Sequence, residues 1–335
     1  MDLKTLKKID TSKMYTIYDK WSEIGEKQYN SDFKLIEISS PKHIVFSGMG
    51  GSGAISDLFS SILSKTNIHV DVVKGYILPK TVDSDSLVIC ISISGNTAET
   101  LSILEQANKI GCSIIAFSDG GKMERFSNKK NIHFIKIPVY HSPRASFTSY
   151  LYSMLKVLGP ILPIDESDII ESLKKMKELE REICSDNLTE ENPALNLAKW
   201  LPEVPVIYFP WGLESAAIRF KNSLQENSKM HVIAEDIIEA CHNGIVSWDR
   251  TTKMKPILIE GRDDYIKTKE RWTVIKKFFE ERNIDFKEIY SVEGSIISKL
   301  INLIYLFDYT SIYKAVIDGI DPTSVEPINF VKRKI

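Results

Sequence analysis

The sequence predicts an α/β protein built from two tandem domains, each a parallel sheet flanked by helices. Short β-branched runs alternate with helical segments in the first half of the chain, which is typical of a parallel sheet covered by helices. Strand-like runs stop at Ser142, a helical stretch follows, and the alternation resumes near Leu201. The 335 residues suffice for two packed cores. We therefore expect a first domain over 1–155, a helical connector over 156–200 and a second domain over 201–335.

The strands and helices of the first domain follow from two different spacings. The segment TAETLSILEQANKIG has apolar residues at helical spacing, and its last residue, Gly111, is the expected helix stop. The apolar face of this helix is expected to carry Leu101, Leu104, Ala107 and Ile110. Runs rich in β-branched residues predict strands at 43–47, 69–73, 86–94, 113–118 and 132–139.

The second domain repeats the alternation of strands and helices, but its residues show no internal repeat, so a duplication is an architectural inference only. Before it, the connector carries the charged stretch 171–192, whose polar face we expect to lie in solvent. Helical spacing predicts helices over 213–228 and from Tyr265 onward. Strands of the second domain are predicted at 204–209, 231–235, 255–260 and 286–292.

Composition excludes several classes of partner and location. Lys plus Arg number 43 and Asp plus Glu 45, so a net charge of −2 leaves no excess to hold a nucleic acid or an anionic membrane. The four cysteines lack CxxC spacing, so we expect neither disulfides nor a cysteine zinc site. The first residues lack an apolar signal segment, and the apolar run from Leu300 to Phe307 is far short of a membrane span. We therefore expect a cytoplasmic protein.

A glycine loop follows the first predicted strand. Its residues Gly48, Gly50 and Gly53 satisfy the pattern GxGxxG, and Asp71 stands 18 positions beyond Gly53, so a nicotinamide-dinucleotide fold must be considered. Against that interpretation, Asp71 falls in the middle of its apolar run, whereas a ribose-binding carboxylate is expected at the end of a strand. Tight glycine turns are also needed wherever backbone approaches another anion.

A second loop carries hydroxyl groups. Ser92, Ser94 and Thr97 stand where a buried strand ends and a helix begins, and open parallel sheets bind ligands at that edge. Amides of a helix N-terminus and hydroxyls together can cradle a dianion. The alternative is that Thr97 is only a helix N-cap, with Thr100 as filler. No GK[ST] follows the glycines, which excludes a P-loop and a nucleoside triphosphate.

These two loops carry a resemblance to a known family. GMGGSG (48–53) and SISGNTAET (92–100) resemble the sugar isomerase (SIS) domain, a flavodoxin-like α/β unit that binds phosphosugars. FKNSLQENSK and HNGIVSW look like the KNELNENSK and HNEIVGW segments of bifunctional phosphoglucose/phosphomannose isomerases, SPRAS (142–146) matches their PRA segment, and the closing residues resemble their DPTPVxxIxxLK. The matching segments run from about residue 44 to the C-terminus, so the resemblance implies two tandem SIS domains.

The resemblance implies an aldose-ketose isomerase that interconverts glucose 6-phosphate with fructose 6-phosphate through an enediolate, with mannose 6-phosphate as an expected further substrate. Glu226 would be the base, Arg144 would stabilise the enediolate, and His242 would assist ring opening. Lys332 aligns with the family's terminal lysine, although an exposed tail lysine is an equal alternative, and Thr323 is a candidate for substrate choice. The phosphate would be held by Gly50, Gly51, Ser52, Ser92, Ser94 and Thr97.

The resemblance also implies how the sites assemble. In the family the histidine comes from the neighbouring subunit, so we expect a homodimer with shared sites, with no cofactor and no metal for the reaction. Three positions depart from the family pattern: Gly244 replaces a common glutamate, Cys241 replaces an asparagine, and Gln225 stands where asparagine is frequent. These departures bear on substrate preference and on the orientation of His242.

Two other functions share parts of this pattern. A non-catalytic phosphosugar sensor could use the same loop, but such sensors usually carry an effector domain, and both halves here are occupied by the tandem fold. An amide-transferring synthase that makes glucosamine phosphate is a further alternative, but the chain does not begin with the nucleophilic cysteine of its glutaminase part. The isomerase is the interpretation that accounts for both halves.

Overall fold

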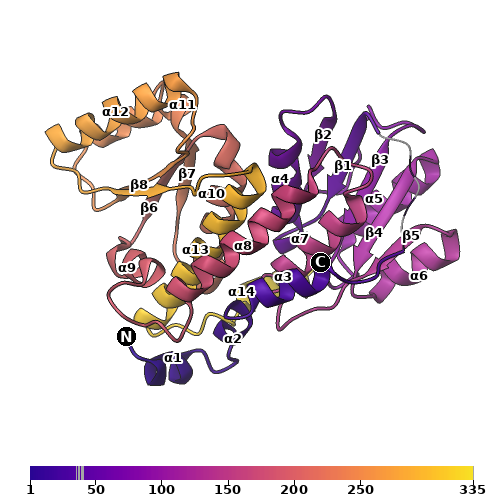
Figure 1. Cartoon of the computed structure of the whole chain (residues 1–335), viewed down its shortest axis with the longest axis horizontal. Helices are drawn as coiled ribbons and strands as arrows, with labels where there is room; N and C mark the ends of the chain where they lie inside the picture. The colour runs from indigo at the N-terminus through magenta and orange to yellow at the C-terminus, as the bar shows by residue number, and fades with distance from the viewer. Residues whose placement is uncertain (35, 37, 39–40, 335) are drawn as a thin grey trace. The chain divides into compact units, whose positions relative to one another are not determined.

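The structure is a computed structural model that describes residues 1–34, 36, 38 and 41–334. Its chain divides into two compact units (Figure 1). The N-terminal unit comprises Lys20–Lys174, and the C-terminal unit comprises Met1–Asp19 together with Lys175–Ile335. Each unit holds one parallel sheet with helices around it, so the predicted α/β class with two tandem sheets is confirmed. The first 19 residues group with the second half of the chain, which the predicted domain bounds do not reflect.

The sheet of the N-terminal unit has the strand order β2-β1-β3-β4-β5, and its neighbouring strands pair in parallel. The chain leaves β1 toward β2 on one side and later enters β3 on the other side, so the order reverses between β1 and β3. Open α/β sheets bind ligands at such a reversal. The strands are β1 (His43–Ser47), β2 (His69–Val73), β3 (Leu87–Ile91), β4 (Ser113–Ser118) and β5 (His133–Lys136).

Helices cover both faces of this sheet because its central strands are apolar on both sides. Val88 and Cys90 of β3 pack in one cluster with Leu104 of α5, while Phe46 of β1 stacks on Phe59 of α4 on the other face. Helices α3 and α7 pack against each other in the same unit. The helices are α3 (Trp21–Tyr29), α4 (Gly51–Leu63), α5 (Ala98–Ile110), α6 (Gly121–Lys130) and α7 (Phe147–Leu158).

Three details of the first domain differ from the sequence prediction, one of which is the fifth strand, since β5 covers His133–Lys136 rather than 132–139. The third strand ends at Ile91 rather than at residue 94, because the chain turns at once and the Gly95 amide donates to the Ser92 carbonyl at 2.9 Å. Ile110 is 42% exposed, so its predicted place on the buried face of α5 is wrong; it is the last residue of that helix. Gly111 ends α5 as predicted, with a left-handed φ of 84°.

The sheet of the C-terminal unit has the order β7-β6-β8-β9, again with parallel neighbours. One face carries an aromatic cluster in which Trp248 packs edge to face against Phe279 of α12, together with Ile237 and Ala240 of α11. Helices α10 and α13 pack against each other in the same unit. The elements are β6 (Pro205–Phe209), α10 (Glu214–Asn227), β7 (Ile233–Asp236), α11 (Ile237–Ala240), β8 (Lys255–Glu260), α12 (Ile266–Glu281), β9 (Lys287–Tyr290) and α13 (Ile296–Ile317).

Helix α13 corrects the expectation that no segment approaches the length of a membrane span. It has 22 residues and is long and apolar enough to cross a membrane by length and composition alone. Most of its apolar window, 83%, is buried inside the protein, as in the core helix of a globular domain. The remaining helices are α1 (Leu3–Ile9), α2 (Tyr15–Tyr18), α8 (Glu166–Ile183), α9 (Pro193–Trp200) and α14 (Glu326–Lys332).

Candidate active site

The strand reversal in the N-terminal unit brings the two loops singled out in the sequence to one edge of the sheet. Strands β1 and β3 are hydrogen-bonded neighbours, with Ser47 opposite Cys90 in the register. The glycine loop leaves the carboxyl end of β1 and opens α4, and the hydroxyl loop leaves the carboxyl end of β3 and opens α5. Two helix N-termini therefore begin side by side at this edge, and their first amides have no partners within their own helices.

The glycine loop needs its glycines for space and for conformation. Gly50 is the N-cap of α4 and has a positive φ of 56°, which most side chains disfavour. A Cβ on Gly48 would lie 2.8 Å from the Cβ of Ser52, too close for any larger residue without a shift of the helix. Ser52 is buried in the first turn of α4. The loop thus holds the start of the helix close to the end of β1.

The hydroxyl loop is held by contacts among its own side chains. The Ser92 hydroxyl donates to the Thr97 hydroxyl at 3.0 Å, and the Asn96 amide donates to Ser94 Oγ at 3.3 Å. Thr97 stands at the N-cap of α5, but its side chain makes no capping hydrogen bond. The interpretation of Thr97 as only a helix cap is therefore not supported, since its hydroxyl serves the loop rather than the helix.

The loop at Gly120 and Gly121 packs against the hydroxyl loop, and the sequence analysis did not identify it. Gly95 has a φ of 65°, and a Cβ there would lie 1.8 Å from the Gly120 carbonyl oxygen. The Met123 amide donates to the Gly95 carbonyl at 2.9 Å, and the Lys122 amide donates to the Asn96 side chain at 3.1 Å. The signal available in the sequence was the pair Gly120-Gly121 directly after a predicted strand, which resembles the turn after β1.

Arg144 lies beside the glycine loop. Its Cα would be 3.6 Å from a Cβ on Gly51, and the Pro143 carbonyl oxygen would be 3.4 Å from the same point. The turn that carries Arg144 is held in place by a hydrogen bond, because the Trp21 indole donates to the Ala145 carbonyl at 2.8 Å. Arg144 itself is only 6% exposed. The structure therefore brings this guanidinium-bearing residue to the same loop as the first turn of α4.

Asp71 does not do what a dinucleotide-binding fold requires. It is the third residue of β2 rather than the residue that ends the strand, and it pairs in the register with Val45 of β1. Its carboxylate lies 2.9 Å from His43 Nε2. A ribose-binding carboxylate would instead stand at the carboxyl end of the second strand, near the glycine loop. The position of Asp71 therefore does not support the nicotinamide interpretation of the GxGxxG pattern.

Glu226 lies in the last turn of α10 in the C-terminal unit, where the helix packs against α13 through buried polar groups. The Arg219 guanidinium donates to Asp308 at 2.6 Å, and the Ser223 hydroxyl donates to the same carboxylate at 2.5 Å. Burial lowers the pKa of Arg219, but attraction to Asp308 outweighs burial and raises the pKa overall, with a further contribution from Glu226. A permanent cation thus acts electrostatically on the Glu226 carboxylate.

The end of α10 is tied to the tail that carries Thr323. Lys229, in a left-handed conformation with a φ of 58°, donates from its ammonium group to the Glu226 carbonyl at 2.6 Å and to the Ser324 carbonyl at 2.7 Å. The Thr323 amide donates to Asp321 Oδ1 at 2.8 Å, which fixes the turn. The predicted residue Thr323 is therefore held close to the helix end that bears Glu226. Lys332 is exposed near the end of α14.

His242 is exposed and follows α11, which opens at the carboxyl end of β7. Along the chain, Glu226 precedes β7 and His242 follows it, with Glu226 in the last turn of α10 and His242 just after α11. Next to His242, a Cβ on Gly244 would lie 2.4 Å from Glu235 Oε2. Position 244 carries glycine where the family commonly has glutamate, and the Glu235 carboxylate occupies the space that a side chain at 244 would need.

The structure groups the predicted residues by unit. Gly50, Gly51, Ser52, the three hydroxyl residues of the β3 loop and Arg144 gather at one sheet edge of the N-terminal unit. Glu226, His242 and Lys332 belong to the C-terminal unit, at separate places in its fold. The sequence analysis did not identify the loop at Gly120 or the Arg219–Asp308 pair, whose two residues are 89 positions apart.

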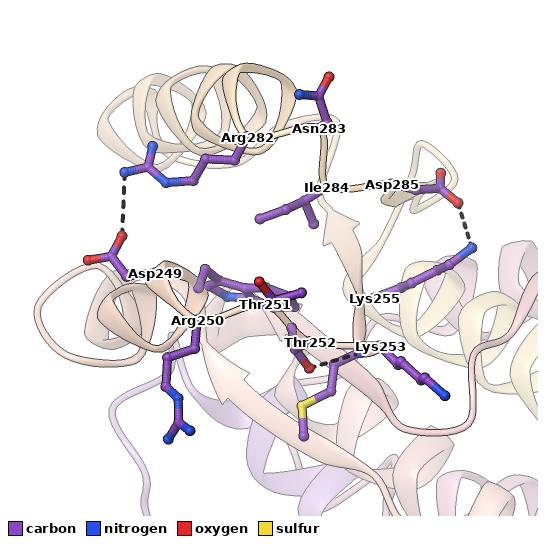
Figure 2. A pocket seen from close by; sticks show the side chains of 12 residues that line it. Asp249, Arg250, Thr251, Thr252, Lys253, Lys255, Arg282, Asn283, Ile284 and Asp285 are labelled. Atoms are coloured by element: carbon purple, nitrogen blue, oxygen red, sulfur yellow. Dashed lines mark hydrogen bonds and ion pairs between the residues drawn. The ribbon is translucent and has the colours of Figure 1, made fainter.

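A pocket of about 510 Å³ in the C-terminal unit lies apart from these residues (Figure 2). It opens at the amino ends of β8 and β9. Figure 2 shows two ion pairs in its walls, Arg282 with Asp249 at 3.5 Å and Lys255 with Asp285 at 2.7 Å, and Arg250 and Lys253 also line it. None of the predicted site residues lines it.

Comparison with known proteins covers both units. The SIS domain family matches residues 37–158, and the bacterial phospho-glucose isomerase C-terminal SIS domain family matches residues 190–335. A bifunctional phosphoglucose/phosphomannose isomerase from Caldicellulosiruptor bescii is 34% identical, with 93% of this chain and 94% of that protein covered. An Aquifex aeolicus protein of the same name is 28% identical over 89% and 92%. A hypothetical protein from Thermus thermophilus has a similar fold, with a TM-score of 0.71, 14% identity, and 99% and 89% coverage.

Proposed function

Because the chain belongs to the family of bifunctional phosphoglucose/phosphomannose isomerases, we propose that it interconverts glucose 6-phosphate and mannose 6-phosphate with fructose 6-phosphate. One observation of the structure supports binding of the substrate's phosphate group: helices α4 and α5 begin side by side at the strand reversal, with hydroxyl groups between their N-termini. Amides, hydroxyls and two aligned helix dipoles favour a dianion there without the need for a lysine.

The phosphate anchor fixes the sugar for the chemistry at its other end. Ser52, Ser92, Ser94 and Thr97, with the Gly50 and Gly51 amides, hold the phosphate in this proposal. A phosphate bound at carbon 6 orients the carbon 1 to carbon 2 bond without taking part in its reaction, so binding energy is converted into positioning. Arg144, beside Gly51, then supplies a cation that stabilises the enediolate and neither gains nor loses a proton.

Glu226 is the proposed base. It removes the proton beside the carbonyl and returns it to the neighbouring carbon, so one carboxylate serves both half-reactions. The buried Arg219 interacts electrostatically with Glu226. His242 and Lys332 are proposed to assist ring opening, with His242 supplied by the other subunit of a cytoplasmic homodimer.

The test is a coupled assay in which fructose 6-phosphate is the substrate and the glucose 6-phosphate formed is oxidised by a dehydrogenase. We expect Glu226→Gln to lower kcat by about 100- to 10,000-fold, the usual contribution of a general base, with little change in KM. Glu280→Gln, at an exposed position of α12, is the matched control and should keep the parent rate. A Glu226→Gln enzyme with near-parent kcat would show that another group is the base.

The same assay separates the isomerase from the non-catalytic alternative. A phosphosugar sensor would bind fructose 6-phosphate, as measured by calorimetry, and release no glucose 6-phosphate. Substrate range is measured by replacing the substrate with mannose 6-phosphate and following fructose 6-phosphate. Turnover of glucose 6-phosphate but not of mannose 6-phosphate would restrict the proposal to the first pair of sugars.

A further inference from the structure

We propose that His43, His69 and Asp71 form a binding site for a divalent transition-metal ion such as Zn²⁺. They stand on the neighbouring strands β1 and β2, and their ligand atoms all lie within 4.8 Å of one another. Within the described residues, this is the one group of three or more His, Cys, Asp or Glu side chains with that geometry. The sequence analysis used Asp71 only to judge a dinucleotide fold and did not consider the two histidines.

The spacing of the three groups suits a metal of this size. His43 Nε2 lies 2.9 Å from Asp71 Oδ2, and His69 Nε2 lies 3.5 Å from the same oxygen. Zinc binds histidine nitrogen and carboxylate oxygen at about 2.0–2.2 Å, which places tetrahedral ligand atoms about 3.3 Å apart. These two distances lie on either side of that value, and the third pair of ligand atoms, one from each histidine, lies within 4.8 Å. The two rings are also close, with centroids 4.9 Å apart.

The partner of the second ring nitrogen of His43 favours the tautomer that a metal needs. His43 Nδ1 lies 3.1 Å from Ser86 Oγ, and the Ser86 hydroxyl donates to Asp83 Oδ1 at 2.9 Å. Since the serine proton is used on Asp83, Nδ1 is the donor to Ser86, and the 2.9 Å contact between Nε2 and Asp71 Oδ2 is a hydrogen bond whose proton a bound metal ion would replace. A histidine ligand whose other nitrogen is held by a hydrogen bond, itself backed by a carboxylate, is the usual arrangement around protein-bound metals.

Register and burial explain why these residues meet. His43 opposes His69 at the start of both strands, and Asp71 stands two residues further along β2, on the same side as His69. The side chain of His69 is 65% exposed, so it can turn toward a metal and leave a position open to water. Two imidazoles and one carboxylate select zinc and its neighbours in the first transition series over Mg²⁺ or Ca²⁺, which prefer oxygen ligands.

The location separates this site from the proposed catalysis. The cluster lies at the amino ends of β1 and β2, whereas the phosphate loops leave the carboxyl ends of β1 and β3. Strand β2 is the edge strand of its sheet, bonded only to β1 within the described strands. A metal held by both strands therefore clamps the edge strand in place, and its expected effect is on stability rather than on turnover.

The experiment titrates Zn²⁺ into full-length protein freed of metal with EDTA, in competition with a chromophoric chelator. We expect one equivalent bound by the parent protein, an affinity at least tenfold weaker in His69→Ala and in Asp71→Asn, and an unchanged affinity in His133→Ala. His133 is the matched control, because it is an exposed histidine that opens β5, the edge strand on the opposite side of the same sheet. Co²⁺ in place of Zn²⁺ should give visible absorption bands that the two ligand variants lack.

Folding and activity provide independent readouts. Excess Zn²⁺ should raise the Tm of the parent protein and leave that of His69→Ala unchanged, while the isomerase rate after EDTA treatment should equal the untreated rate. Equal zinc affinity in parent and Asp71→Asn, or no stoichiometric binding by the parent, would overturn the site. A loss of isomerase activity on EDTA treatment that Zn²⁺ restores equally in His69→Ala would place a functional metal elsewhere.

Discussion

Gly95 allows two loops of the N-terminal unit to pack closely, because it has no side chain to clash with Gly120. Gly95 and Gly111 both have positive φ, 65° and 84°, so alanine at either position costs about 1–2 kcal/mol of backbone strain. They differ in space: a Cβ at 95 would lie 1.8 Å from the Gly120 carbonyl oxygen, and a Cβ at 111 would meet nothing within 4 Å. Comparison of Gly95→Ala with Gly111→Ala therefore separates the cost of backbone strain from the cost of a steric clash between the loops.

We therefore expect Gly111→Ala to lower the free energy of unfolding by about 1–2 kcal/mol and to leave KM for fructose 6-phosphate unchanged. Gly95→Ala should cost more stability and should also raise KM, because the hydroxyl loop must move away from Gly120. Urea denaturation and the coupled assay measure the two effects. If Gly95→Ala changed stability and KM no more than Gly111→Ala does, the close contact between the loops would be of no consequence.

The pair formed by Arg219 and Asp308 is a second residue-scale test. Both side chains are buried, at 3% and 0% exposure, so removal of one partner leaves the other as an unpaired buried charge. We expect Asp308→Ala to lower the free energy of unfolding by about 3–5 kcal/mol. The double change Arg219→Met and Asp308→Leu should cost less than Asp308→Ala alone, because no charge is then left behind. Thermal and urea unfolding of the parent, Arg219→Met, Asp308→Leu and the double variant form a double-mutant cycle, and strictly additive changes in the free energy of unfolding would contradict the coupling.

At the scale of elements, the end of α10 and the following tail depend on one lysine. The Lys229 ammonium joins the Glu226 carbonyl to the Asp321 and Ser324 carbonyls. Lys229→Asn removes the ammonium but keeps a residue that tolerates a positive φ. We expect faster proteolysis of the tail after residue 320 and a loss of about 1–2 kcal/mol of stability. Lys277→Asn on the exposed face of α12 is the control, and equal tail cleavage in both variants would contradict the tie.

Elements were the part of the fold that the sequence could predict. Strands 43–47, 69–73, 113–118 and 255–260 have the predicted bounds, since a buried parallel strand is a local apolar run between turn signals. The prediction was too long at 86–94, because Ser92 and Ile93 continue the apolar alternation while the backbone already turns. Apolar spacing alone does not show where hydrogen bonding between strands stops.

The candidate site was predictable where it depends on local sequence and not where it depends on tertiary contact. The glycine and hydroxyl loops could be found because strand, turn and helix follow one another within a few residues. Arg219 could not, since its partner Asp308 is distant in sequence and an arginine on a helix is usually solvated. The same holds for His43 and His69, which only the pairing of β1 with β2 brings together.

At the scale of the whole molecule, each unit contributes a different part of the proposed reaction. The N-terminal unit holds the phosphate loops and Arg144, and the C-terminal unit holds Glu226 and His242. Within the C-terminal unit, Glu226 lies in the last turn of α10 and His242 follows α11, on the two sides of β7 in the chain. The proposal that two subunits share each site rests on the family resemblance of the segments around these two residues.

The proposal of shared sites makes a quantitative prediction for mixed subunits. Glu226→Gln and His242→Ala homodimers should each be nearly inactive. If each site takes its glutamate from one subunit and its histidine from the other, a heterodimer of the two variants contains one site with both parent residues and one with neither. Random reassembly yields half heterodimers, so mixing equal amounts through denaturation and refolding should restore about a quarter of the parent activity. If both residues came from one subunit, every site in the mixture would lack one of them and refolding would restore no activity. The Glu226→Gln protein refolded with itself controls for activity gained by refolding alone.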